Sequence, residues 1–136
     1  MANAVYDTFK EGLLNKEFDL NSDIIKATLS DAAYYSYSAA HDFYAGGSPD
    51  VPANAKTAES GQLGSPTIAN GVFDTADFTW SAVATENPQE QIILWDDSIT
   101  DDRLIIFYDT GMTGMPVTPN GGDINVTVNA SGWFAL

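Results

Sequence analysis

The chain has 136 residues, no cysteine, and nineteen acidic against five basic residues, which give a formal net charge of −14 at pH 7. Without cysteine, disulfides, thiolate nucleophiles and thiolate metal sites are excluded. The scarcity of Lys and Arg argues strongly against binding to nucleic acid or to an anionic membrane surface, because both are polyanions. The excess of acidic residues either serves solubility alone, or marks a surface that is held away from DNA or that faces a basic partner.

The length suits one domain, and an apolar fraction of 44% is sufficient for a buried core. The first ten residues lack the basic start and the unbroken apolar stretch of a signal peptide. No apolar run approaches the roughly 18 residues that span a bilayer. Since the chain also has no cysteine to oxidise, we expect synthesis in a reducing cytoplasm.

The first predicted element is a short helix or arm within residues 5–14. Its apolar residues recur near helical spacing. They are Val5, Tyr6, Phe9, Leu13 and Leu14. Gly12 weakens such a helix by up to ~1 kcal/mol relative to alanine. Phe18 and Leu20 then follow as apolar anchors of an extended segment, which precedes the first convincing strand.

A strand is predicted over residues 23–30, with Ile25, Ala27 and Leu29 on one face. Residues 31–47 form an aromatic-rich loop, for which we expect a helical turn near residues 39–44. Glycines and prolines then interrupt regular structure. Loops of this length tend to be functional or covered by a partner.

The second half has stronger β character. Residues 91–95 and 103–108 are near-continuous apolar runs typical of central strands buried on both faces, and the acidic residues 96–102 form the hairpin loop between them. Residues 123–129 alternate strictly between apolar and polar side chains, and residues 132–136 suit a last strand. The predicted core residues are Ile93, Trp95, Ile105, Phe107, Ile124, Val126 and Val128.

The predicted fold class is therefore mostly β, a jelly-roll-like or β-sandwich single domain with a short N-terminal helix or arm. We expect two parts, an N-terminal arm or helix over residues 1–20 and a β domain over residues 21–136. The strand order cannot be deduced from this pattern.

Few residues indicate catalysis. His41 is the only histidine, no G-x-S-x-G motif accompanies it, and we expect it to cap or pack within the aromatic loop. Among nineteen acids, chance carboxylate pairs are expected, so a glycosidase-like pair carries little information. We predict no enzyme activity, no cofactor and no transition-metal site. Calcium binding by the acidic loop 96–102 stays open, although its spacing is not that of an EF-hand.

Several blocks resemble those of small structural proteins encoded by tailed bacteriophages. The blocks are residues 6–16, 19–27, 40–44, 71–77, 102–105 and 116–123. The resemblance implies a virion component that decorates the capsid, also called a cement protein. Such a protein binds the major capsid protein on the outer capsid surface after synthesis in the host cytoplasm. Decoration proteins often occupy threefold positions, which implies a homotrimer.

Two other functions stay open beside capsid decoration. One is a head–tail connector or tail component, which would occur in far fewer copies per virion. The other is a carbohydrate-binding β-sandwich module, in which Trp80, Trp95 or Trp133 would be exposed and would stack on sugars.

Two regions are predicted to contact the partner: the N-terminal segment 5–20, as an arm that can leave the domain, and the aromatic loop 34–44. Tyrosine is favoured at interfaces because it combines a large area with a polar tip. The alternative is that these aromatic rings close one end of the core. The candidate partner-binding residues are Tyr6, Phe9, Lys10, Leu13, Lys16, Tyr34, Tyr35, Tyr37, Phe43 and Tyr44.

Overall fold

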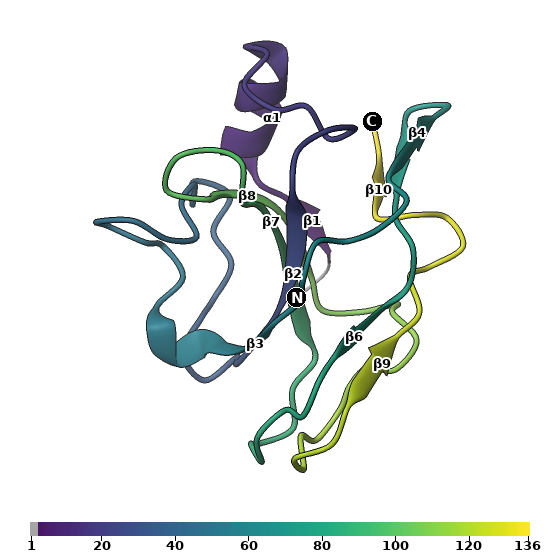
Figure 1. Ribbon diagram of the computed structural model, residues 1–136. Coiled ribbons are helices and arrows are strands. Elements are labelled where there is room, and N and C mark those ends of the chain that lie inside the picture. Colours follow the sequence, from purple (N-terminus) through teal and green to yellow (C-terminus); the bar gives the residue numbers. More distant parts are fainter. Residues whose placement is uncertain (1–2) are drawn as a thin grey trace.

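Two antiparallel layers make up the structure, a computed structural model that describes residues 3–136 (Figure 1). The elements are β1 (Ala4–Val5), α1 (Asp7–Leu14), β2 (Ile25–Ser30), the 3₁₀ turn η1 (Ala53–Ala55), β3 (Lys56–Glu59), β4 (Thr67–Ala69), β5 (Val72–Asp74), β6 (Phe78–Trp80), β7 (Gln91–Asp96), β8 (Arg103–Tyr108), β9 (Ile124–Val126) and β10 (Phe134–Ala135). The larger layer is a five-stranded sheet in the order β1-β8-β7-β2-β3. The second layer combines the three-stranded sheet β10-β5-β4 with the two-stranded sheet β6-β9. The predicted mostly β domain with a short N-terminal helix is confirmed.

The central strands β2, β7 and β8 are buried on both faces, as the apolar runs in β7 and β8 predict. On one face the second layer covers them, and the Trp80 indole N–H donates to the Ala27 carbonyl at 3.1 Å. On the other face lies the loop between β2 and β3 (Figure 1). There the ring of Tyr44 stacks on Trp95 with 4.1 Å between centroids, and the Tyr44 and Thr28 hydroxyls are 2.6 Å apart. The loop therefore acts as a third layer over the sheet.

Only part of the helical turn expected near residues 39–44 is present: the His41 N–H donates to the Ser38 carbonyl at 3.0 Å, which forms a single turn over residues 38–41. Phe43 instead forms an isolated antiparallel bridge with Arg103. The backbone N–H of Tyr44 donates to Asp102 at 2.6 Å, and that of Leu104 donates to Asp42 at 2.7 Å. Because the start of β8 satisfies the backbone groups of residues 42–44, the turn does not continue into them.

The N-terminal segment belongs to the domain, which corrects the expectation of an arm that can leave it. β1 pairs with β8, with Ala4 opposite Phe107, and it continues into α1. Tyr6 and Phe9 are fully buried against the sheet. Arg103 at the start of β8 forms ion pairs with Glu17 and Asp42, and thereby ties the residues after α1 to the aromatic loop. Met1 and Ala2, also assigned to the arm, lie outside the described residues.

The predicted core is confirmed, and the first half of the chain adds to it. All seven core residues expected from the second half are buried, with exposed fractions between 0% for Ile93 and 7% for Val128. The first half contributes buried side chains from the segment that contains β1 and α1, from β2, and from the loop between β2 and β3. Among them are Tyr6, Phe9, Leu29, Tyr35, Tyr44 and Val51.

Gly12 is required where α1 packs against the segment that follows it. A Cβ at this position would lie 2.5 Å from Cε2 of Phe18. The Phe18 ring cannot yield, because it packs edge-on against Phe9 at 4.8 Å and the Arg103 guanidinium lies over it. We expect Gly12→Ala to destabilise the protein by about 1–3 kcal/mol through overpacking, despite the better helix propensity of alanine.

Urea unfolding of the variant checks this, with Glu11→Ala on the exposed side of α1 as the control. A Gly12→Ala protein as stable as the wild type would show that the helix can shift away from Phe18.

Candidate partner-binding surface

Four of the ten predicted partner-binding residues are in the core, which corrects their assignment. Tyr6, Phe9, Tyr35 and Tyr44 are at most 3% exposed. The hydroxyls of Tyr6 and Tyr35 lie 2.7 Å apart, and burial is the main reason that the pKa of each is raised. These rings are buried inside the domain and the tyrosine hydroxyls are hydrogen-bonded there, so the side chains cannot anchor a partner without leaving the core.

His41 packs within the aromatic loop, as expected. Its Nδ1 atom lies 2.9 Å from the Tyr35 hydroxyl, and its carbonyl accepts a hydrogen bond from Thr8 in α1 at 2.7 Å. The histidine therefore helps to join the loop to the helix.

The acidic loop 96–102 begins at the last residue of β7 and is held by a contact to β2 and by contacts of its own. Asp97 forms an ion pair with Lys26 at 2.8 Å, and Asp96 accepts a hydrogen bond from the backbone of Ser98 at 2.8 Å. Asp96 is fully buried. Desolvation is the main cause that raises the pKa of Asp96 to about 7, and a hydrogen bond to Asp23 is the second cause. Within residues 3–136, no group of three or more His, Asp or Glu side chains could hold a metal ion.

The six remaining predicted residues are at least partly accessible. Lys10, Lys16 and Tyr34 are exposed. Leu13, Tyr37 and Phe43 are half-buried. The structure does not gather the six into one surface: Lys10 and Leu13 line a small hollow beside α1, and Leu13 also lines a larger apolar hollow next to it.

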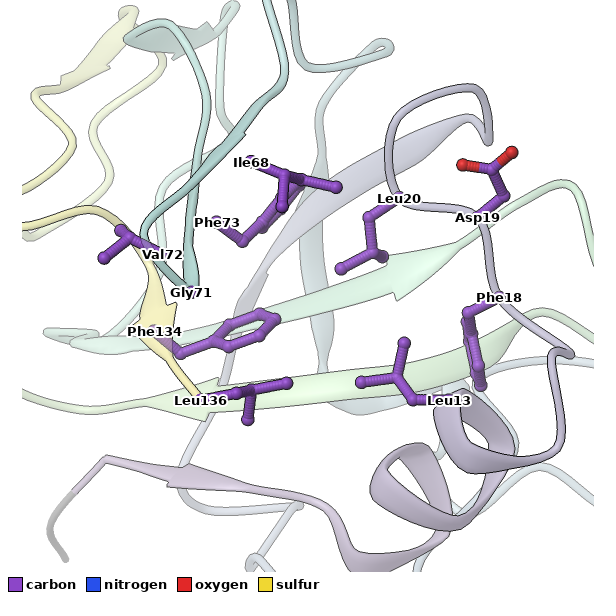
Figure 2. Close-up of a pocket in the computed structure, with 10 residues that line it drawn as sticks. All are labelled: Leu13, Phe18, Asp19, Leu20, Ile68, Gly71, Val72, Phe73, Phe134 and Leu136. Carbon is purple, nitrogen blue, oxygen red and sulfur yellow. The ribbon is translucent and has the colours of Figure 1, made fainter.

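The larger hollow, which we name the α1–β4 groove, lies between the end of α1 with the segment 18–20 on one side and the sheet β10-β5-β4 on the other (Figure 2). Its volume is about 250 Å³. Asp19 is the charged residue in its lining. The lining residues are Leu13, Phe18, Asp19, Leu20, Ile68, Gly71, Val72, Phe73, Phe134 and Leu136.

The sheet builds one wall of the groove through a single row of side chains. Ile68 of β4 pairs with Phe73 of β5, and Phe73 pairs in turn with Phe134 of β10. Directly paired residues lie on the same face of a sheet, so these three side chains form one apolar row. Figure 2 shows the row facing Leu13 and Leu20 across the groove.

The rim of the groove exposes large apolar side chains. Leu136 is 72% exposed and Ile68 is 55% exposed. Leu14, 86% exposed, lies beside Leu136 in an adjoining hollow of about 200 Å³ that Lys10 and Leu13 also line. Contiguous exposed apolar side chains on a small soluble domain mark an interaction surface.

The sequence carries a signal for this surface in its distribution of charge. Residues 60–73 and 124–136 contain no charged side chain, in a chain with twenty-four Asp, Glu, Lys and Arg residues. The first stretch supplies β4 and β5, and the second supplies β10. A search for helical or strand periodicity does not detect stretches that merely lack charge. For this reason neither Ile68 nor Leu136 was among the predicted partner-binding residues.

No helix within residues 3–136 is both long and apolar enough to cross a membrane. Comparison with known proteins finds no protein-family model, no curated protein and no solved structure that matches the chain.

Proposed function

We propose that this chain is a non-enzymatic virion protein of a tailed bacteriophage, a capsid decoration protein that binds the major capsid protein on the outer surface of the shell. The α1–β4 groove is the observation that carries the proposal, because it is an apolar surface on an otherwise acidic domain. The sequence blocks described above supply the phage context.

The charge of the domain supports a position outside a DNA-filled shell. Four of the five bases form contacts within the chain: Lys10 with Asp7, Lys26 with Asp97, Lys56 with the Tyr44 carbonyl and Arg103 with Glu17 and Asp42. The remaining acids leave a strongly negative surface, which DNA repels. Assembly as a homotrimer at threefold positions belongs to the same proposal.

A head–tail connector or tail component is the second candidate, since the same groove would serve it. The number of copies per virion separates the two. The carbohydrate-binding alternative loses its support, because Trp80, Trp95 and Trp133 are at most 3% exposed. Each indole N–H also donates within the protein, to Ala27, Thr28 and Thr75 respectively.

Changing Leu136 to glutamate tests the groove as the binding surface. We expect binding to shells of the major capsid protein to weaken by about 30-fold, the loss of one apolar anchor worth about 2 kcal/mol. The side chain is mostly exposed, so the fold should be retained, which circular dichroism checks. Cosedimentation with shells assembled without this chain measures the binding.

Thr100→Glu adds the same charge on the exposed β7–β8 loop and serves as the control. Equal loss of binding in both variants would assign the effect to charge and not to the groove. Failure of the wild-type protein to bind shells, with binding to isolated necks or tails, would favour the connector or tail function instead.

A further inference from the structure

The outer strand of the small sheet, β4, has a free edge. Within residues 3–136, β4 pairs with β5 and with no other strand. The two strands are joined by Asn70 and Gly71, whose φ angles of 52° and 77° are typical of a two-residue type I′ turn. In such a hairpin the residues that flank the turn, Ala69 and Val72, form the hydrogen-bonded pair nearest to it.

Hydrogen-bonded and non-hydrogen-bonded pairs alternate along an antiparallel ladder, and this determines the direction of the backbone groups of the next residue. Ile68, opposite Phe73, is a non-hydrogen-bonded position with respect to β5. Its backbone N–H and C=O therefore point away from β5, towards the free edge. A further strand beside β4 would pair with this donor and this acceptor.

β4 is only three residues long, but its edge lacks two other features that usually prevent such pairing, charged side chains and a covering segment. All three residues of β4 are exposed, and no charged residue occurs between positions 60 and 73. Natural edge strands are commonly protected by charged side chains, by proline or by a covering segment. Here Pro66 stands before the strand and leaves Ile68 with its N–H.

The free edge and the α1–β4 groove are continuous. A residue of an added strand opposite Ile68 would extend the row of Phe134, Phe73 and Ile68 by one position. Its side chain would then lie on the groove face of the sheet, beside Leu20 (Figure 2). Main-chain hydrogen bonds to the edge and one apolar side chain in a neighbouring hollow are the two components of recognition by strand addition.

We propose that β4 and the α1–β4 groove together form a strand-addition site, which binds an extended segment of a partner protein with a large apolar side chain opposite Ile68 and with Lys or Arg beside it. This inference rests on the proposed function, and names the kind of capsid segment that the groove accepts. Basic flanks follow from charge complementarity: Asp19 lies at the groove, Glu59 and Asp74 bound the uncharged stretch, and the chain carries −14 overall. A second copy of this chain would bring the same acids and be repelled.

Two variants at one position separate the edge from the groove. Ile68→Ala removes the apolar side chain and keeps the N–H, whereas Ile68→Pro removes both. Since the Ile68 N–H points away from β5, proline leaves the β4–β5 ladder intact. We expect Ile68→Ala to bind shells of the major capsid protein more weakly than the wild type, and Ile68→Pro to bind about tenfold more weakly again, the effect of one lost hydrogen bond.

Amide hydrogen exchange of the wild-type protein tests strand addition without any variant. On binding to shells, the Ile68 amide should exchange at least about tenfold more slowly, because it becomes hydrogen-bonded. Equal binding by the alanine and proline variants, together with unchanged exchange at Ile68, would overturn strand addition and leave the groove as the docking surface.

The remaining outcomes are also distinct. If the wild-type protein does not bind shells at all, the proposed function fails. If the isolated protein forms dimers that Ile68→Pro dissociates, as sedimentation would detect, the occupant of the edge is a second copy and the partner segment proposed here is wrong.

Discussion

Replacing Phe9 with alanine is expected to lower the free energy of unfolding by about 3–5 kcal/mol, the usual cost of removing a fully buried phenylalanine. Phe9 is 0% exposed. Its ring packs edge-on against Phe18 at 4.8 Å and against Phe134 at 5.6 Å, and so joins α1 to the last strand of the chain. Urea unfolding followed by tryptophan fluorescence measures the change.

Leu14→Ala is the matched control, because Leu14 lies in the same helix and is 86% exposed. A surface change of this kind should alter stability by no more than about 0.5 kcal/mol. If Phe9→Ala proves as mild as Leu14→Ala, the N-terminal segment 5–20 would be a detachable arm, as the sequence alone led us to expect, and the packing described above would not hold in solution.

The second large effect concerns Asp96. We expect Asp96→Asn to stabilise the protein relative to the wild type increasingly as the pH rises from about 4 to about 7, by at most about 4 kcal/mol in total. The asparagine amide supplies a donor for Asp23 at every pH, whereas the aspartic acid supplies one only while it keeps its proton. Unfolding free energies of both proteins between pH 4 and 8 measure the difference.

The direction follows from the raised pKa. Burial and the contact with Asp23 hold the pKa of Asp96 at about 7 in the folded protein, against about 3.9 in an unfolded chain. Between these values the unfolded state has released its proton and the folded state still binds it. The contribution of Asp96 to stability therefore falls as the pH rises through this interval, and is constant above it.

Other carboxylates also titrate in this range, so the comparison with the variant isolates Asp96. Asp102, near the same cluster, has a raised pKa that desolvation causes, and it remains in both proteins. Asp101→Asn, an exposed change in the same loop, serves as the control. Parallel pH profiles for the wild type and Asp96→Asn would show that the Asp96 carboxyl is not held protonated by its surroundings.

The sequence predicted the elements whose side chains follow a clear period. β7 and β8 were identified from apolar runs, and the strand at β9 from alternation, with Ile124 and Val126 buried and Asn125 exposed as expected. These patterns reflect burial on one or two faces, which the backbone geometry of a strand imposes directly.

The short strands β3 and β4 were not predicted. β3 follows the 3₁₀ turn and mixes polar with apolar residues, and β4 is exposed at all three positions. Without a buried face, neither strand produces a period that the sequence can show. Their formation depends on the partners that the fold supplies, β2 for β3 and β5 for β4.

The assignment of tyrosines to an interface failed for a related reason. Tyr35, Tyr44 and the exposed Tyr34 come from one short stretch of similar composition, and yet only the first two are buried. Tyrosine suits a core and an interface equally well, provided that its hydroxyl has a partner. Tyr44 has two, Thr28 in β2 and Glu59 in β3, and neither could be inferred from the local sequence.

The pairing of β1 with β8 has a consequence for synthesis. Ala4 meets Phe107, so the first strand has no partner until 103 further residues have been made. At the usual elongation rate of about 5–20 residues per second, this delay lasts roughly 5 to 20 seconds. Throughout that time Tyr6 and Phe9 have no sheet to cover them once they have left the ribosome. The high density of carboxylates in the same nascent chain would then keep neighbouring polysome-bound copies apart, because like-charged chains repel each other.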